Sequence, residues 1–285
     1  MRRLHVLAML PVLLAVASCA TADPARVPAT ESLSVVSLNI YHDKADWAKR
    51  LPLIVGGLRA LEPDVIALQE VLQHERLPNQ AQTIADALGY RMHFVSTDPP
   101  ARPRRYGNAI LTPHPILARS ERRLQPFDDG RTVAHARIAV GGRAIDVYAT
   151  HLHHTAEGQA IRSRQLQDVI AHVEATGDDA PRILLGDFNA TIPDAALQPL
   201  LARYVDSYGS LHADADAQRA DTTLNPAFFD EGRRIDHILA ERGRFEVLDA
   251  DIVLDRADGG GTWPSDHFGM HATLRLLPVA GEARR

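Results

Sequence analysis

The sequence has a single cysteine, Cys19, among its 285 residues. A disulfide within the chain is therefore excluded, and so are catalytic thiols and cysteine-based metal sites anywhere after residue 19. The chain also lacks an excess of basic residues, with 31 Lys and Arg against 36 Asp and Glu and a formal net charge of −5. No global positive field attracts nucleic acid, although a local basic patch could still bind a polyanion.

Long apolar runs are confined to the N-terminus. Arg2 and Arg3 precede LHVLAMLPVLLAVAS, which is too short and too interrupted by proline for a comfortable membrane span. A positive head followed by a short apolar stretch is typical of a secretory signal. The stretch ends in V-A-S-C at 16–19, which resembles the bacterial lipobox. We therefore expect residues 1–19 to be a signal peptide with a lipobox and Cys19 to be lipidated.

The expected destination is the cell envelope, with the exported protein held at a membrane through the lipidated Cys19. The alternative is a periplasmic or secreted protein that is cleaved after the A-T-A of residues 20–22. Residues 20–32 are expected to form a short flexible tether. Residues 33–285 are then expected to be one monomeric domain, because no repeat or low-complexity linker interrupts them.

Helix and strand patterns alternate through this domain. Apolar residues recur at helical spacing in 46–61, 80–89 and 157–175. The extended segments are 33–40, 64–70, 108–116, a hairpin within 135–152 that turns at Gly141-Gly142, and the runs RILLGDFN, RIDHILAE and MHATLRLL. Hairpins mixed with helical crossovers indicate an α+β fold.

The segment LLGDFNA, residues 184–190, shows the pattern that bears on chemistry. An apolar strand stops at Gly186 and is followed by Asp187 and Asn189. Both residue types are favoured in turns, which is one explanation. The other explanation is that the two-residue period of a strand puts both side chains on one face, where they serve a site.

Polar groups also end most of the other apolar strands. They are Asn39, Glu70, Asn108, His151, Asp187 with Asn189, Asp236, and Asp266 with His267. A single carboxylate at a buried strand end is most simply a hydrogen-bonded core group, because an unpaired one is costly. Seven such ends are more economically explained by convergence on one cluster of carboxylates, amides and imidazoles.

The ordered motifs L-N-I, L-Q-E-V, G-D-F-N, R-I-D-H and S-D-H resemble those of the endonuclease/exonuclease/phosphatase superfamily, over about residues 35–275. The resemblance implies a four-layer α/β/β/α sandwich with two packed, mostly antiparallel sheets. It also implies a metal-dependent phosphoric ester hydrolase that uses Mg²⁺, with Mn²⁺ as the alternative. The implied metal ligands are Asn39, Glu70 and Asp266, and the implied phosphate-binding residues are Tyr106 and Asn108.

The catalytic residues that the resemblance implies are His151, Asp187, Asn189, Asp236 and His267. A divalent cation held by carboxylate and amide oxygens would neutralise charge that develops on a phosphate. Asp187 would orient or deprotonate the attacking water, and Asn189 would hold the phosphate or that water. His267 would donate to a phosphoryl oxygen while Asp236 fixes its tautomer. His151 would contact the phosphate or assist the leaving group.

Several substrates are compatible with this resemblance. The expected activity is that of a phosphodiesterase on nucleic acid, or on a phospholipid headgroup as in sphingomyelinase and phospholipase C. A phosphomonoesterase on inositol or sugar phosphates and a non-catalytic surface binding module are the alternatives. Tyr41 stands where abasic-site nucleases of the family carry an acid, whereas T-H-L followed by Arg162 and Gln165 partly resembles the secreted sphingomyelinases.

Two other features near these motifs bear on the substrate. The basic loop ARPRRYGN, residues 101–108, is either a solvated loop or a clamp for a phosphate-rich substrate. Phe228, Phe229 and Trp263 lie close in sequence to the polar strand ends. They are either core residues or a rim that contacts a base or a lipid.

The segment HLHHTA, residues 151–156, resembles the start of the H-x-H-x-D-H zinc motif of metallo-β-lactamase-type hydrolases. Thr155 and Ala156 stand at the two later positions, where the motif needs Asp and His. A histidine-rich zinc site is therefore disfavoured, and we expect His153 and His154 at the rim or on the surface.

Overall fold

A computed structural model of the chain describes residues 32–215 and 221–278. The expected signal peptide, the lipidated Cys19 and all but the last residue of the expected tether lie outside the described residues. Within the two described ranges, no helix is long and apolar enough to cross a membrane.

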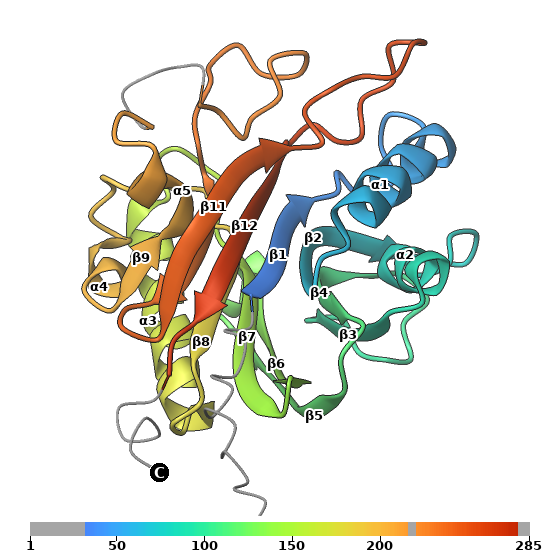
Figure 1. The fold of residues 1–285 in the computed structure, drawn as a ribbon. Helices are drawn as coiled ribbons and strands as arrows, with labels where there is room; N and C mark the ends of the chain where they lie inside the picture. The colour runs from blue at the N-terminus through green and yellow to red at the C-terminus, as the bar shows by residue number, and fades with distance from the viewer. Residues whose placement is uncertain (1–31, 216–220, 279–285) are drawn as a thin grey trace, which may run out of the picture.

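Twelve strands in the described part of the chain form two six-stranded sheets (Figure 1). The first sheet has the order β11-β12-β1-β2-β4-β3 and the second has the order β5-β6-β7-β8-β10-β9. The strands are β1 Ser32–Asn39, β2 Val65–Gln73, β3 Arg91–Ser96, β4 Arg105–Thr112, β5 Ile116–Arg123, β6 Thr132–Val140, β7 Arg143–His151, β8 Arg182–Asp187, β9 Tyr204–Asp206, β10 Asp236–Glu241, β11 Phe245–Val253 and β12 Gly269–Leu276. Neighbouring strands are antiparallel except for β1 with β2 and β7 with β8.

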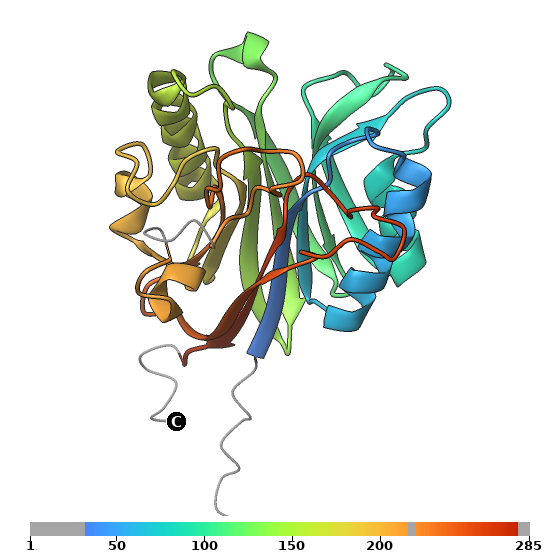
Figure 2. The same cartoon turned by 90° about the horizontal axis from the view of Figure 1, so that it is seen from above.

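Helices cover the outer faces of both sheets. α1 (Trp47–Leu61) and α2 (Gln80–Leu88) pack on the first sheet, and α3 (Gln159–Thr176) packs on the second. Figure 2 shows α3 and the α1–α2 pair on opposite sides of the two sheets. The shorter elements are η1 Phe127–Asp129, α4 Gln198–Leu201 and α5 Ser207–Leu211. The predicted four-layer sandwich with mostly antiparallel sheets is confirmed.

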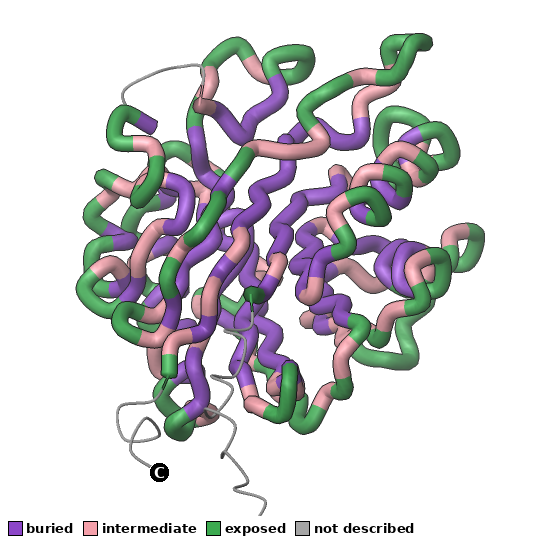
Figure 3. Tube along the Cα trace, viewed as in Figure 1, coloured by how far each residue is buried: buried purple, intermediate pink, exposed green. Residues whose placement is uncertain are grey.

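The central strands consist mostly of buried residues, as Figure 3 shows. In β1, Val35 belongs to the core between the sheets, while its neighbour Val36 packs under α1 and α2. Ala67 and Ile66 divide in the same way in β2. Strands with two buried faces read as continuous apolar runs rather than as an alternation. This burial gives the central strands the clearest apolar signal in the sequence.

The four strands that the sequence did not predict are β3, β5, β9 and β11, and each lies at the edge of a sheet. Edge strands carry charged and exposed residues that discourage pairing with other chains, which weakens their apolar pattern. β5 reads ILARSERR and β11 reads FEVLDADIV. The prediction of one extended segment over 108–116 is also wrong. β4 ends at Thr112 and β5 begins at Ile116, on either side of Pro113 and Pro115.

The predicted hairpin within 135–152 is confirmed as β6 and β7. Its turn residues Gly141 and Gly142 have φ angles of 53° and 84°. A two-residue turn with positive φ at both positions matches the twist of the flanking strands, and glycine adopts it without strain. The helices expected at 46–61, 80–89 and 157–175 correspond to α1, α2 and α3.

Candidate active site

The topology brings the predicted polar strand ends to one edge of the sandwich. The parallel pair β7–β8 places His151 opposite Asp187, and Asp236, the first residue of β10, also pairs with Asp187. Asn39 ends β1 next to β2, and Asp266 lies three residues before β12, the other neighbour of β1. We call the gathered side chains the strand-end cluster: Asn39, Glu70, His151, Asp187, Asp236, Asp266 and His267.

Asp187 is the centre of this cluster and is almost completely buried. Its Oδ2 accepts a hydrogen bond from Asn39 Nδ2 at 3.1 Å and lies 3.4 Å from His151 Nε2. Its Oδ1 accepts from the backbone N–H of Asn189 at 2.9 Å. Burial, and then the charge of Asp236, raise the pKa of Asp187 above the ordinary aspartate value. A carboxylate with a raised pKa is suited to accept a proton from water near neutral pH.

Asp236 and His267 form the acid–imidazole pair that the sequence suggested. His267 Nδ1 lies 2.8 Å from Asp236 Oδ2, and the other ring nitrogen is 3.9 Å from Asp187 Oδ2. Burial acts to lower the pKa of His267, but Asp236 and the other carboxylates outweigh it and raise the value to about 10. His267 is therefore a cationic donor at neutral pH, aimed at the carboxylate of Asp187.

Glu70 does not end β2 as the sequence suggested, because the strand continues to Gln73. The pairing of β2 with β4 shifts register between Leu68 and Val71, which marks a bulge, and Glu70 has a φ of 60°. A left-handed conformation is unfavourable for a residue with a side chain and recurs at functional sites. The bulge lets Glu70 leave the regular alternation of the strand.

Glu70 and Asp266 supply the oxygen ligands that a hard divalent cation prefers. Burial, and the repulsion of Glu70 on top of it, raise the pKa of Asp266 to about 6. A carboxylate whose pKa is raised by a neighbouring carboxylate fits a bound cation, because the cation would remove this repulsion. Asn39 fits the role of a metal ligand less well. Its Oδ1 already accepts a hydrogen bond from the N–H of Tyr41, and its amide NH₂ donates to Asp187.

Tyr106 and Asn108 both lie on β4 beside the strand-end cluster. Burial and the adjacent charge of Glu70 raise the pKa of Tyr106, so its hydroxyl stays protonated and can donate. The amide of Asn108 is buried and donates to the carbonyl and the hydroxyl oxygen of Thr132, at 3.1 and 3.2 Å. A contact between this amide and a phosphate would require the bonds to Thr132 to open.

Asn189 lies beyond the end of β8, which stops at Asp187. The prediction that strand alternation puts both side chains on one face is wrong, because Asn189 has a φ of 49° and is not extended. Its N–H bonds Asp187 while its amide donates to the carbonyl of Leu152 at 3.1 Å. The turn explanation therefore holds for the backbone of Asn189, and the turn fixes the orientation of Asp187.

Gly186 allows β8 to reach the site beside β7. Its φ is 150°, and a Cβ at this position would lie 2.0 Å from the carbonyl oxygen of Thr150. No side chain tolerates that approach to a neighbouring backbone, so the strand end needs glycine.

We therefore expect Gly186→Ala to lower the free energy of unfolding by about 3 kcal/mol, from the clash and the unfavourable φ together. Gly243→Ala is the control, because Gly243 also has a positive φ, 71°, but has open space at its Cβ. That control should cost only about 1 kcal/mol. Urea unfolding of both variants measures the difference, and equal losses would show that the contact with Thr150 is unimportant.

Arg50 was not predicted, yet it organises the loops beside the cluster. Its guanidinium is buried and donates to the carbonyls of Ile40, Tyr41, His42, Lys44 and Pro264. These bonds tie the loop after β1 to the loop that carries Asp266. The sequence offers no signal for this role, because an arginine on a predicted helix is normally solvent-exposed.

The histidines of HLHHTA are not arranged as zinc ligands. Both ring nitrogens of His153 are engaged, with Asp129 Oδ1 at 2.8 Å and Thr155 Oγ1 at 2.9 Å. Gln165 accepts from the N–H of His153 and donates to Asp129, and Arg162 donates to the carbonyls of His153 and Thr155. The Arg162 and Gln165 pair on α3 therefore holds the loop after β7.

Two groups of potential metal-ligating side chains stand out in the described residues. Asp187, Asp236 and His267 belong to the strand-end cluster, and the other group is Asp249, Asp251 and His271. Asp249 and Asp251 are exposed on the edge strand β11, whereas all three residues of the first group are buried. The second group shares no residue with the strand-end cluster.

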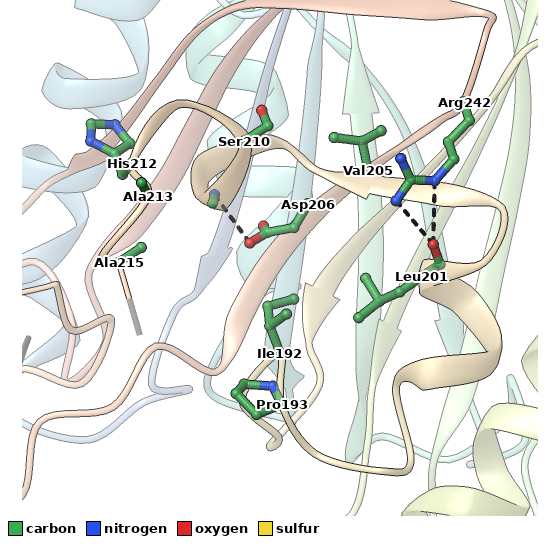
Figure 4. Close-up of a pocket in the computed structure, with 11 residues that line it drawn as sticks. Ile192, Pro193, Leu201, Val205, Asp206, Ser210, His212, Ala213, Ala215 and Arg242 are labelled. Carbon is green, nitrogen blue, oxygen red and sulfur yellow. Dashed lines mark hydrogen bonds between the residues drawn. The ribbon is translucent and has the colours of Figure 1, made fainter. Parts of the chain in front are cut away.

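A large cavity of about 650 Å³ lies elsewhere, between α4, β9 and α5. Figure 4 shows its lining, with Asp206 accepting from a backbone N–H of α5 and Arg242 donating to the carbonyl of Leu201. Apolar side chains such as Ile192 and Val205 make up much of its wall. It contains none of the predicted site residues, so size alone does not locate the chemistry.

Comparisons with known proteins agree with this fold and these motifs. The sequence profile of the Endonuclease/Exonuclease/phosphatase family matches residues 36–267. A Drosophila melanogaster protein described as a candidate neutral sphingomyelinase is 27% identical over 87% of this chain and 61% of its own length. Mouse tyrosyl-DNA phosphodiesterase 2 is 27% identical over 90% of this chain and 70% of its own length. This chain thus spans less than two thirds of the Drosophila protein.

Solved structures show the same architecture. The structure of Danio rerio TDP2 complexed with single-strand DNA product superposes with a TM-score of 0.72, at 19% sequence identity. The match covers 86% of this chain and 99% of that chain. At this level of identity the similarity shows the fold alone.

Proposed function

The chain belongs to the endonuclease/exonuclease/phosphatase family, whose members are phosphoester hydrolases, and on that premise we propose that it is a divalent-metal-dependent phosphodiesterase. One observation supports this most: the Asp187 carboxylate, with a raised pKa, lies beside the His267 imidazolium. The charge of His267 in turn acts on Asp266, the neighbour of Glu70 in the proposed metal site. A proton acceptor, a cationic donor and a pair of metal-binding carboxylates are the groups that phosphoester hydrolysis needs.

In this proposal the phosphate of the substrate binds among the side chains of the strand-end cluster. Asp187 accepts a proton from the attacking water, while Asn39 and the Asn189 backbone hold its carboxylate in place. His267 donates from Nε2 to a phosphoryl oxygen, and Asp236 keeps the imidazole charged.

His151 is neutral at physiological pH in the same scheme. Burial, together with the positive charge of Arg131, holds its pKa well below the ordinary histidine value. Its Nδ1 is buried without a hydrogen-bond partner in the described structure. We propose that His151 contacts a substrate oxygen or the leaving group, as the resemblance implied.

The family depends on a divalent metal ion, and the residues present fit one. Glu70 and Asp266 would hold it, with Asn39 nearby, and the all-oxygen donor set favours Mg²⁺ over softer metals. When bound, the cation supplies charge neutralisation at the phosphate.

The surroundings of the site favour a diester. Phe229 packs edge-on against His267, and Phe228 packs against Tyr41 while remaining 40% exposed. An exposed aromatic surface beside the cationic imidazole suits a substrate with a second group attached to its phosphate, such as a nucleobase or a lipid. A phosphate monoester has no such group to place there.

A substrate panel with Mg²⁺ tests the proposal. We expect the purified protein to hydrolyse at least one diester among single-stranded DNA, RNA, sphingomyelin and phosphatidylinositol, and to lose this activity with EDTA. Inositol phosphates and a sugar phosphate represent the monoester class. Hydrolysis confined to the monoesters would replace the proposal by a phosphomonoesterase, and no hydrolysis at all would favour a non-catalytic binding module.

We also propose that the protein is exported and lipid-anchored at the cell envelope. The support is the V-A-S-C motif at 16–19 after the apolar run, with Cys19 as its single cysteine. Mass spectrometry of the native N-terminus tests this proposal. A diacylglyceryl adduct on Cys19 is the expected result, and an unmodified chain that begins at Asp23 would contradict it.

A further inference from the structure

Arg131 lies directly before β6, at the same edge of the sandwich as the strand-end cluster. The carbonyl of the next residue, Thr132, accepts from Asn108 Nδ2 and from Thr150 Oγ1, both at 3.1 Å. Thr150 immediately precedes His151 in β7. The backbone at Arg131 is therefore fixed between two strands that supply predicted site residues.

The guanidinium of Arg131 is largely shielded from solvent but poorly bonded. The side chain is only 10% exposed, yet its Nε has no hydrogen-bond partner in the described structure. The nearest carboxylate oxygen, Asp129 Oδ2, is 3.7 Å away, beyond hydrogen-bond distance, and Nη2 makes one long contact of 3.5 Å with His154 Nδ1. A largely shielded cation with unused donors is costly unless a ligand completes its bonds.

Arg50, a fully buried arginine beside the cluster, shows the contrast. Its donors are all directed at five backbone carbonyls, so it has none left for a substrate. Arg50 therefore has a structural role, whereas most N–H donors of Arg131 remain available to bind a ligand.

The positive charge of Arg131 affects the pKa values of residues at the centre of the site. After burial it is the strongest influence that lowers the pKa of His151, and it opposes the rise in the pKa of Tyr106. These two residues flank the place where the proposed function puts the phosphate. An anionic substrate bound there would lie within the field of this guanidinium.

We propose that Arg131 is a substrate-binding residue that donates its guanidinium fork to non-bridging oxygens of the substrate phosphate. The inference rests on the proposed function and adds to it a cation that the family resemblance did not supply. The planar fork of arginine matches two phosphate oxygens at once, which a lysine cannot do.

Asp129 positions the guanidinium of Arg131 without accepting hydrogen bonds from its N–H groups. His153 and Gln165 hold its carboxylate at 2.8 and 2.6 Å. Asp129 therefore attracts Arg131 from a fixed place but lies too far away to bond it.

Arg131→Gln and Arg131→Lys test the proposal, with Arg119→Gln as the control for an equal loss of charge from exposed β5. On any diester that the wild-type protein hydrolyses, Arg131→Gln should raise KM by roughly 10- to 100-fold. The inhibition constant of inorganic phosphate should rise by a similar factor. Arg131→Lys should lie between the wild type and Arg131→Gln, because it keeps the charge but loses the fork.

Each outcome separates this inference from the proposed function. If the wild-type protein hydrolyses no phosphoester, the proposed function fails. The role of Arg131 is then tested by comparing the affinity for inorganic phosphate of the wild type and Arg131→Gln. If the wild type is active and Arg131→Gln keeps its KM and its phosphate inhibition, Arg131 does not bind substrate. Should Arg131→Gln fail to fold, Arg131→Lys decides, since wild-type values in that variant would equally overturn the proposal.

Discussion

Asp187→Asn should lower kcat by roughly 10²- to 10⁴-fold on any substrate that the protein hydrolyses, the usual scale for a positioned proton acceptor. The change removes the group that accepts a proton from water. It also disturbs the geometry, because Asp187 uses one oxygen for Asn39 and the other for the Asn189 backbone. An asparagine has a single acceptor oxygen, so one of these donors would face an NH₂ group.

Steady-state kinetics measures this effect, and a thermal melt of the same sample shows that the domain is folded. Asp249→Asn is the matched control, since it removes an aspartate charge from the exposed edge strand β11. The control should keep the wild-type kcat. A kcat in Asp187→Asn within threefold of the control would remove Asp187 from the role of proton acceptor.

Glu70→Gln should abolish measurable Mg²⁺ binding while leaving the fold intact. The substitution keeps the shape of the side chain but removes the charge that contributes to the raised pKa of Asp266. Without metal, the variant should be more stable than the wild type by about 1 kcal/mol, or roughly 2–4 °C in melting temperature for a domain of this size. A rise in metal-free stability combined with lost metal binding distinguishes a ligand from a structural carboxylate.

Isothermal calorimetry with Mg²⁺ and metal-free melting curves check both parts of this prediction. Glu75→Gln is a suitable control, because Glu75 is an exposed acid shortly after β2 that belongs to neither ligand group. Unchanged Mg²⁺ affinity in Glu70→Gln would show that Glu70 does not hold the metal.

The fold was predictable where its strands are buried on both faces. β1, β2, β7, β8 and β10 show apolar runs because each places residues in the core between the sheets and others against an outer layer. The edge strands were missed for the opposite reason. β5 and β11 carry several charges each, and their extended conformation is set by pairing with β6 and β12 rather than by a local pattern.

The site was predictable to the extent that strand ends determine it. Asp187, Asp236, His151 and His267 come together because parallel and antiparallel pairing bring their strand ends to one edge. The backbone conformations at Glu70 and Asn189 were not predictable in this way, since a bulge and a left-handed turn depend on tertiary context.

Arg131 was missed although the same rule applies to it. β6 is antiparallel to β7, so the amino end of β6 lies beside the carboxyl end of β7, where His151 is. The residue that precedes an antiparallel strand is therefore a candidate site residue, just as the residue that ends a strand is. Arg131 meets this criterion. Arg50 could not have been found from the sequence, because its partners are backbone carbonyls of distant loops.

The central claim is that the strand-end cluster hydrolyses phosphodiesters with a divalent metal ion bound at Glu70 and Asp266. The most direct measurement is hydrolysis of bis(p-nitrophenyl) phosphate by the metal-stripped protein as Mg²⁺ is added back. We expect no turnover in the stripped protein, full recovery with Mg²⁺ in the wild type and in Asp249→Asn, and no recovery in Glu70→Gln. Turnover that persists without metal would contradict the claim, and so would recovery that is lost in Asp249→Asn but retained in Glu70→Gln.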